Sequence, residues 1–220
     1  MICPRFCPHS EKALSLLVQH LSPESDSGGV PRLVGIGGPG GGGKSMLSDW
    51  LKESLPSCEV LSLDDFRLPR ASRPRHAPFG SHPDAVDFSR LQAVLTSARA
   101  GGPVHQPVFD LDKGHAQNHK VLPAADVLLL DGEITAYEML DAYLDVRILV
   151  QSSLWTQLRT RLNRDRGDRG CSLSKTLKIY VQSNLKDHPR FSKGAEEKAQ
   201  LIFYRHPRKG LHLRKNLLIS

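Results

Sequence analysis

A glycine-rich loop restricts the fold of this chain more than any other feature. It reads Gly38-Pro-Gly-Gly-Gly-Gly43-Lys44-Ser45 and fits G-x-x-x-x-G-K-[ST], the phosphate-binding P-loop pattern, at every fixed position. A short apolar run at 32–36 precedes it and an amphipathic helical pattern follows it, unlike the surroundings of a flexible glycine linker. Such a loop curls backbone N–H groups around a phosphate, which requires residues that tolerate positive φ. We therefore expect the chain to bind a nucleoside triphosphate.

The P-loop pattern also assigns roles to single residues. Lys44 is expected to reach the β- and γ-phosphates of ATP and to act in catalysis, and the Ser45 hydroxyl to ligate Mg²⁺. The positive end of the helix that begins there favours the anion. The predicted ATP-binding residues are Gly38, Gly40, Gly41, Gly42, Gly43, Lys44, Ser45 and Met46.

Apolar runs typical of buried strands alternate with helical patterns along the chain. The expected strands are 32–36, 59–63, 125–130, 145–150 and 199–204, and the expected helices after the P-loop are 87–100, 136–143, 153–164 and 173–181. This alternation predicts the α/β class, with a doubly wound parallel sheet, helices on both faces and the P-loop NTPase topology. We expect an N-terminal helix and linker at 1–31, a P-loop kinase domain at 32–205 and a basic C-terminal tail at 206–220.

Two local expectations follow from the same patterns. Residues 111–123 are mostly polar and are expected to form a loop. The helix at 153–164 is expected to turn Leu154, Leu158 and Leu162 inward, because these leucines recur every four residues.

Composition excludes some classes of function. The chain has 220 residues, and nothing in it resembles a signal peptide or a membrane span, so we expect a cytoplasmic protein with no membrane partner. The net charge of +7 leaves a nucleic-acid-binding P-loop ATPase as an alternative. Aromatic residues for base stacking do not accompany the basic stretches, which makes a nucleic-acid partner the weaker interpretation. The guanine-binding Asn-Lys-x-Asp motif of regulatory GTPases is missing as well.

Acidic residues follow two of the expected strands. Asp131 ends the apolar run 127–130, where a Walker-B carboxylate would share Mg²⁺ with Ser45, and Glu133 is a weaker candidate for that role. Asp64 ends the strand next to the P-loop strand and is expected to accept a proton from a substrate hydroxyl, although Asp65 competes for this role. Strands of an open α/β sheet bind ligands beyond their carboxyl ends, so these groups should meet.

Arginines and glycines alternate between 161 and 172. This composition favours a small mobile lid, in which Arg164 and Arg169 stabilise charge in the transition state. The alternative is a solvated basic end of a helix.

Six stretches, in order, resemble the uridine kinase and phosphoribulokinase family over roughly 30–205. They are Val34-Gly-Ile-Gly-Gly-Pro39, Leu61-Ser-Leu-Asp-Asp-Phe66, His82-Pro-Asp-Ala-Val-Asp-Phe88, Pro107-Val-Phe-Asp110, Leu130-Asp-Gly132 and Arg164-Asp-x-x-x-Arg169-Gly170. The resemblance implies an ATP- and Mg²⁺-dependent kinase that phosphorylates a hydroxyl of a small metabolite, with Asp64 at the position of the catalytic aspartate. Uridine is the first acceptor that it suggests. A homo-oligomer is an open expectation.

The chain departs from this family at positions that handle the acceptor. Ser81 stands where uridine kinases have a nucleoside-binding aspartate, Phe109 replaces a tyrosine, and His115 is displaced by one place from a histidine. A kinase of a phosphorylated sugar or an organic acid is therefore the alternative, and the cationic loop after Arg67 would suit it. The predicted substrate-binding residues are Asp65, Arg67, Ser81, His82, Asp84, Phe109 and His115.

Overall fold

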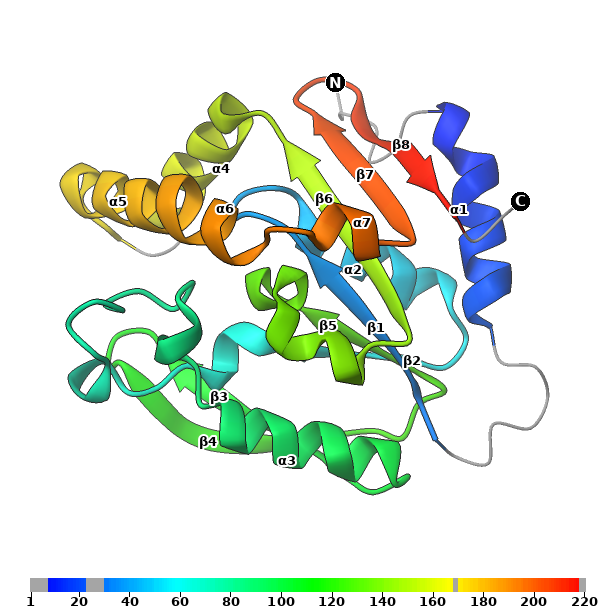
Figure 1. Cartoon of the computed structure of the whole chain (residues 1–220), viewed down its shortest axis with the longest axis horizontal. Helices are drawn as coiled ribbons and strands as arrows, with labels where there is room; N and C mark the ends of the chain where they lie inside the picture. The colour runs from blue at the N-terminus through cyan, green and yellow to red at the C-terminus, as the bar shows by residue number, and fades with distance from the viewer. Residues whose placement is uncertain (1–7, 23–29, 168–169, 218–220) are drawn as a thin grey trace.

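The computed structural model describes residues 8–22, 30–167 and 170–217 and contains a six-stranded sheet in the order β2-β5-β1-β6-β7-β8 (Figure 1). The strands are β1 (Arg32–Gly37), β2 (Cys58–Ser62), β5 (Val127–Asp131), β6 (Val146–Ser152), β7 (Leu201–His206) and β8 (Gly210–Asn216). The first five run parallel, and β8 pairs antiparallel with β7. The predicted α/β class with a mostly parallel sheet is confirmed.

Helical segments connect the strands. The α-helices are α1 (Pro8–Leu21), α2 (Lys44–Ser54), α3 (Phe88–Arg99), α4 (Leu154–Gly167), α5 (Leu173–Ile179), α6 (His188–Phe191) and α7 (Ala195–Lys198). A π-helical segment, η6 (Tyr180–Asp187), joins α5 to α6, and the 3₁₀ segments are η1 (Leu63–Phe66), η2 (Arg70–Ser72), η3 (Pro83–Ala85), η4 (Glu133–Ala136) and η5 (Glu138–Tyr143). The helix predicted at 136–143 is therefore 3₁₀ in geometry. No helix in the described part of the chain has the length and apolarity that crossing a bilayer requires.

Each face of the sheet buries its own hydrophobic core. Helices α1 and α2 cover one face, where they pack on Val34 and Ile36 of β1. Helix α3, η4, η5 and α7 cover the other, where they meet Leu33 of β1 and Leu128 of β5. Successive side chains of a strand point to opposite faces, so a strand that is covered on both sides needs an uninterrupted apolar run. This is why the runs predicted the sheet from local sequence alone.

The polar segment 111–123, for which the composition predicts a loop, forms a turn at 111–114 and then a strand. Strand β4 (His115–Leu122) pairs antiparallel with β3 (Val104–Asp110) and forms a separate two-stranded sheet. Asp110 begins the turn by accepting hydrogen bonds from the N–H groups of Asp112 and Lys113, at 2.8 and 2.9 Å. Most of β4 is exposed, so the alternation of apolar and polar residues that identifies a strand is absent from it.

The basic C-terminal segment is part of the sheet up to Asn216, which corrects the prediction of a separate tail at 206–220. Strand β8 places Leu211 in the core that α1 covers, while its basic side chains Arg214 and Lys215 are not buried. Helix α1 lies beside β8 in Figure 1 and contacts it, so the first and last elements described belong to one domain. A strand that is covered on one face alternates between apolar and polar residues. In β8 the polar residues are mostly basic, which is why the sequence predicts a charged tail there.

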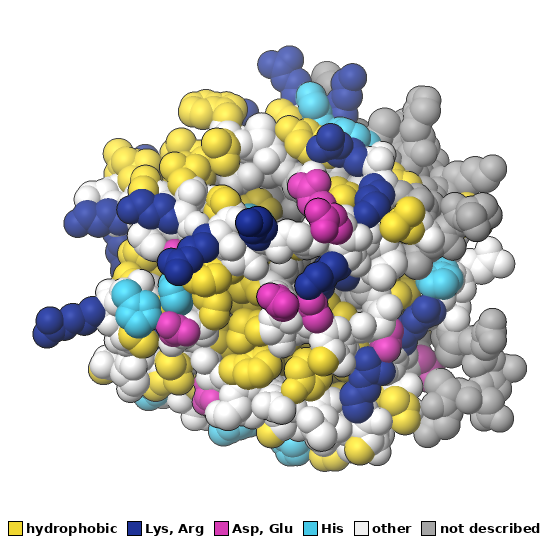
Figure 2. All heavy atoms as spheres, viewed as in Figure 1, with side chains coloured by type: hydrophobic (Ala, Val, Ile, Leu, Met, Phe, Trp, Pro, Cys, Tyr) yellow, Lys and Arg dark blue, Asp and Glu magenta, His cyan; other side chains and the backbone are white. Residues whose placement is uncertain are grey.

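Helix α4 buries its polar side, contrary to the prediction of inward leucines. Its buried residues are Thr156, Gln157, Arg161 and Asp165, whereas Leu154 is 55% exposed and Leu158 and Leu162 are half-buried. This polar side lies against the P-loop, because Arg161 packs on Gly40 and the Gln157 backbone packs on Gly41. Hydrophobic side chains gather on the surface around α4 and α5 in Figure 2, at the upper left of the view.

Candidate active site

The P-loop joins the end of β1 to the start of α2 and needs its glycines for two reasons. Gly38, Gly41 and Gly43 have φ values of 141°, 77° and 106°, which L-residues with side chains rarely adopt. Gly40 has no room for a side chain, because a Cβ there would lie 2.0 Å from Nη2 of Arg161. The loop is therefore shaped both by its own backbone and by the helix packed against it.

Three side chains hold the P-loop carbonyls. Nζ of Lys44 donates to the carbonyl oxygens of Gly38 and Pro39, at 2.9 and 3.2 Å. Nδ2 of Asn184 in η6 donates to the carbonyl of Gly40 at 2.8 Å, and Nη1 of Arg205 in β7 donates to that of Gly41 at 3.2 Å. Asn184 and Arg205 were not among the predicted site residues, because no local pattern relates them to a loop so far away in sequence.

A hydroxyl and a carboxylate meet beside the P-loop. Ser45 donates from Oγ to Oδ2 of Asp131 at 3.0 Å, because the parallel register of β1 and β5 pairs Ile36 with Asp131. Desolvation raises the pKa of Asp131, although the nearby ammonium of Lys44 opposes that shift. Magnesium prefers such oxygen ligands, so the donor set of Ser45 and Asp131 fits the ion that their sequence positions predict.

The two neighbouring aspartates of η1 have different surroundings. Asp65 accepts hydrogen bonds from Nε2 of Gln106 at 2.6 Å and from the N–H of Phe109 at 3.2 Å, so it anchors β3. Asp64 has a side chain that is 51% exposed, and its Oδ1 lies 2.6 Å from Nη2 of Arg67. These contacts leave Asp64, rather than Asp65, as the carboxylate that a substrate can reach.

Cations determine the ionisation of Asp64. Desolvation alone would raise its pKa, but the guanidinium of Arg67 and the ammonium of Lys44 lower the pKa to about 2. Arg164 of α4 contributes in the same direction. Asp64 is therefore ionised at neutral pH, as a proton acceptor must be.

The arginines of α4 differ in burial. Arg161 is 6% exposed, and its Nη2 donates to Oδ1 of Asn184 at 2.8 Å, whereas Nε of Arg164 donates to Oδ1 of Asp165 at 3.1 Å. Residues 161–167 belong to α4, and Arg169 lies outside the described residues. The arginine lid thus remains a prediction, and Arg161 joins the candidate residues.

Ser81 is occupied by protein partners. Its Oγ lies 2.8 Å from Oγ of Ser183 and 2.9 Å from Oδ2 of Asp187, and its carbonyl accepts from the hydroxyl of Tyr137 at 2.9 Å. The side chain that η6 places next to Ser81 is thus a carboxylate, Asp187, which sequence reasoning did not identify.

The other predicted acceptor residues are spread over the loop and the hairpin. His82 packs edge-on against Phe191 with ring centroids 4.8 Å apart, and Nε2 of His76 lies 2.7 Å from Oδ2 of Asp84. Phe109 lies on β3, His115 is exposed on β4, and Arg73 stacks over the Phe109 ring at 5.6 Å. The Met46 side chain packs against the core that α2 covers, so only its backbone is available to the P-loop.

An acid and a histidine that are mostly buried face each other at this end of the sheet. Oε1 of Glu133 lies 3.5 Å from Nδ1 of His188, and neither atom has a hydrogen-bond partner. Burial raises the pKa of Glu133 to about 7, although Lys44 and Arg161 oppose the shift. Burial and the charge of Lys44 lower the pKa of His188 to about 3. Sequence reasoning placed Glu133 as a weaker metal ligand and missed His188, which follows no motif.

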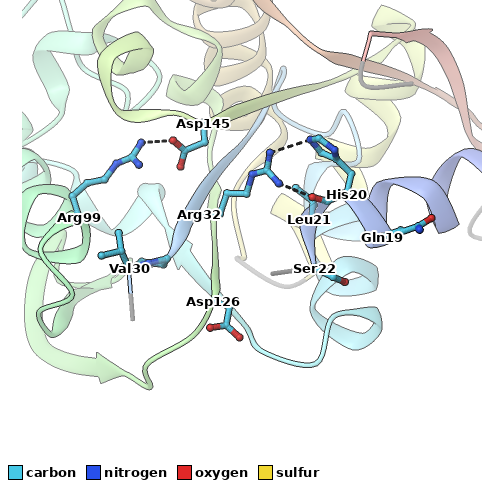
Figure 3. A pocket seen from close by; sticks show the side chains of 10 residues that line it. Gln19, His20, Leu21, Ser22, Val30, Arg32, Arg99, Asp126 and Asp145 are labelled. Carbon is cyan, nitrogen blue, oxygen red and sulfur yellow. Dashed lines mark hydrogen bonds and ion pairs between the residues drawn. The ribbon is translucent and has the colours of Figure 1, made fainter. Parts of the chain in front are cut away.

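A pocket lies at the opposite end of the sheet, away from these groups (Figure 3). It has a volume of about 540 Å³ near the start of β1, and Arg32 and Arg99 contribute to its lining. Arg32 donates to the His20 carbonyl at 2.5 Å, and Arg99 lies 2.7 Å from Asp145, so both cations already have protein partners. The P-loop follows the far end of β1, so this pocket has no part in phosphate binding.

Several curated relatives of this chain are uridine or uridine-cytidine kinases. Uridine-cytidine kinase B of Dictyostelium discoideum is 28% identical over 158 residues, covering 68% of this chain and 65% of the relative. A uridine kinase of Lactobacillus helveticus is 23% identical over 180 residues, covering 78% of this chain and 85% of the relative. The chain spans as little as 20% of the length of other curated relatives that it matches.

Structural similarity extends over more of the chain. D-glycerate 3-kinase from Cryptococcus neoformans superposes with a TM-score of 0.69 at 13% identity, covering 94% of this chain and 99% of that one, which shows a shared fold. The sequence profile of the family described as "Phosphoribulokinase / Uridine kinase family" matches residues 33–212, which include every strand of the main sheet in full or in part. With its P-loop, strand-end carboxylates and sheet order, this chain belongs to the phosphoribulokinase and uridine kinase family.

Proposed function

We propose that the protein is an ATP-dependent kinase that transfers the γ-phosphoryl group to a hydroxyl of a small metabolite. One observation carries the proposal. Lys44, the Ser45–Asp131 pair and the ionised Asp64 lie at or just after the carboxyl ends of three adjacent parallel strands, β1, β5 and β2. Phosphoryl transfer requires a cation at the phosphates, a metal site and a group that orients the nucleophile.

Each group has a separate role in the proposed reaction. Asp64 accepts a hydrogen bond and then the proton from the acceptor hydroxyl, and its ion pair with Arg67 orients the carboxylate. Lys44 and Arg161 are held beside the P-loop by protein contacts, so they can neutralise charge on the transferring group without reorganising. Ser45 and Asp131 would hold Mg²⁺, which supplies Lewis-acid stabilisation of the phosphate oxygens when bound.

A nucleoside, with uridine first, is the acceptor that we propose. Uridine kinases are among the relatives of this chain, which supports a nucleoside as the acceptor. The runner-up is a phosphorylated sugar or an organic acid, suggested by the cationic loop. Two cations of that loop already have partners, because Arg67 pairs with Asp64 and Nε of Arg73 donates to the Leu68 carbonyl at 2.9 Å. This reduces the charge that is available to an anionic acceptor.

Acceptor-dependent release of ADP tests the proposal. Wild-type protein is assayed with Mg·ATP alone and with uridine, cytidine, D-ribose, D-glycerate or fructose 1-phosphate, and we expect uridine to stimulate the reaction. Lys44→Ala should lower turnover by at least about a hundredfold, because it removes the cation at the phosphates. Lys52→Ala, on the same helix but in an exposed ion pair with Glu59, is the matched control and should keep wild-type turnover.

Two outcomes would contradict this proposal. Unchanged turnover and ATP affinity in folded Lys44→Ala protein would remove the P-loop from the reaction. ATP hydrolysis that rises with a polynucleotide, and with none of the small acceptors, would favour the nucleic-acid-binding ATPase.

A further inference from the structure

Glu133 and His188 form a mostly buried polar pair, in which one atom of each side chain has no hydrogen-bond partner. Glu133 lies in η4, just after β5, and His188 begins α6, so the fold alone brings them together. Their facing atoms, Oε1 and Nδ1, lie 3.5 Å apart and are buried without a hydrogen-bond partner. A buried polar atom that lacks a partner costs free energy, so the fold retains this pair at the expense of stability.

The pair lies beside the groups that are proposed to transfer the phosphoryl group. Lys44, Arg161 and Asp64 are all close enough to act on the charge of Glu133. The residues that precede Glu133 and Asp64 are also packed together. A Cβ at Gly132 would lie 2.7 Å from Cβ of Leu63, so the two acidic residues follow backbone segments that are in contact. A ligand that reaches the Glu133 carboxylate is therefore next to the carboxylate proposed as the base.

Aromatic rings complete the surroundings of the pair. The Tyr137 ring lies 6.2 Å from the His188 ring and 5.7 Å from that of Phe191, measured between centroids. The Tyr137 hydroxyl is already bound to the Ser81 carbonyl, so this residue offers only its ring. An apolar wall with a few polar atoms that lack partners is the usual lining of a site for a small ligand.

We propose that Glu133 and His188 bind two hydroxyl groups of an uncharged polyol acceptor and so select it over anionic acceptors. This inference rests on the proposed kinase function. A carboxyl oxygen accepts hydrogen bonds from hydroxyl groups, and the pair offers no cation to an anionic acceptor, which the ionised Asp64 on the same side also repels. His188 supplies a second polar atom at a distance suited to a neighbouring hydroxyl.

The test uses Glu133→Gln and His188→Gln, with the exposed residues Glu138→Gln and His105→Gln as matched controls. Acceptor-dependent ADP release is measured with uridine, cytidine, D-ribose, D-glycerate and fructose 1-phosphate. We expect wild type to prefer an uncharged member. For that acceptor, each active-site variant should raise KM about tenfold or more, because the amide changes which atoms donate and accept at a position where water cannot compensate. The KM for ATP should stay within about twofold of wild type, because the phosphates bind elsewhere.

Two further measurements separate this role from others. A magnesium titration of Glu133→Gln should show the wild-type midpoint, and a shifted midpoint would make Glu133 a metal ligand and overturn the proposal. Calorimetric binding of uridine and of D-ribose, with a non-hydrolysable ATP analogue present, reports on the pair without requiring turnover. Weaker binding to both variants than to their controls is the expected result.

Failure of the inference differs from failure of the proposed function. Turnover of an uncharged acceptor with wild-type KM in both variants, or of anionic acceptors only, overturns the inference and leaves the kinase intact. If no acceptor stimulates ADP release, the proposed function fails for this panel, and the calorimetry alone decides the inference. Absence of binding by any uncharged member would then overturn it.

Discussion

At the scale of single residues, neighbours in sequence have different tasks because their hydrogen bonds differ. Asp64 and Asp65 both follow β2, and the sequence favours Asp64 as the base, with Asp65 as its competitor. Gln106 and the Phe109 N–H bind Asp65, while Asp64 remains half exposed beside Arg67. Tertiary contacts therefore separate a candidate catalytic carboxylate from an anchoring one.

Paired substitutions test this separation. Asp64→Asn keeps the shape but cannot accept a proton, so kcat should fall by about a hundredfold or more while thermal stability stays close to wild type. Asp65→Asn weakens the anchor of β3, and we expect a loss of about 1–3 kcal/mol in the free energy of unfolding. Urea denaturation and steady-state kinetics on both variants check the assignment. A kcat defect confined to Asp65→Asn would move the base by one residue.

At the scale of elements, helix α4 shows that a helix can bury polar side chains when its neighbour is a loop. The P-loop exposes carbonyls and lacks side chains, so Arg161 fills the space next to Gly40 and holds Asn184, which donates to the Gly40 carbonyl. Of the leucines on the same helix, Leu154 is exposed and Leu158 and Leu162 are only half-buried, which departs from the usual rule for an amphipathic helix.

Arginine substitutions on α4 test its role in the reaction. Arg164 acts on the charge of Asp64, so Arg164→Ala should lower kcat by about 10²-fold with little change in the KM for ATP. Arg166→Ala, at an exposed position of the same helix, should leave both constants near wild type. Equal kinetics for the two variants would return this end of α4 to ordinary solvated surface.

At the scale of the whole molecule, burial of His188 connects the site to stability. Its pKa is about 3 in the folded protein and 6.5 ordinarily, so between these values the unfolded chain binds a proton that the folded chain does not. Stability is therefore lost as pH falls through this window, by up to about 1.4 kcal/mol per pH unit. Glu133 has the opposite effect between pH 4.5 and pH 7. Its pKa is raised in the folded protein, so the folded chain binds the proton there and stability is lost as pH rises.

Denaturation of wild type and His188→Gln at several pH values checks this linkage. Below pH 4.5 the carboxyl of Glu133 is protonated in both states, so the region between pH 4.5 and pH 3 isolates the histidine. There the wild type should lose stability relative to the variant as pH falls. A difference between the two proteins that does not vary with pH would show that His188 is accessible to protons.

The sequence by itself determined the parts of this protein that are encoded within a few neighbouring residues. The P-loop and the apolar strands required only local spacing, because both depend on backbone geometry and on the two-residue period of a strand. Strand ends also followed from local pattern, which located Asp64 and Asp131 even though their roles remain predictions. Polar strand β4 and basic strand β8 were missed, because pairing partners rather than their own apolar residues define them.

Only the tertiary structure decided which distant side chains meet. Asn184 reaches the P-loop, Asp187 reaches Ser81, and Glu133 meets His188, each across a separation that no sequence period spans. Packing of η6 and α6 over the carboxyl end of the sheet creates all three contacts. The phosphate-handling half of the site is therefore local in sequence, whereas its proposed acceptor half is assembled by packing, because hydrogen bonds between remote elements form only once the helices are in place.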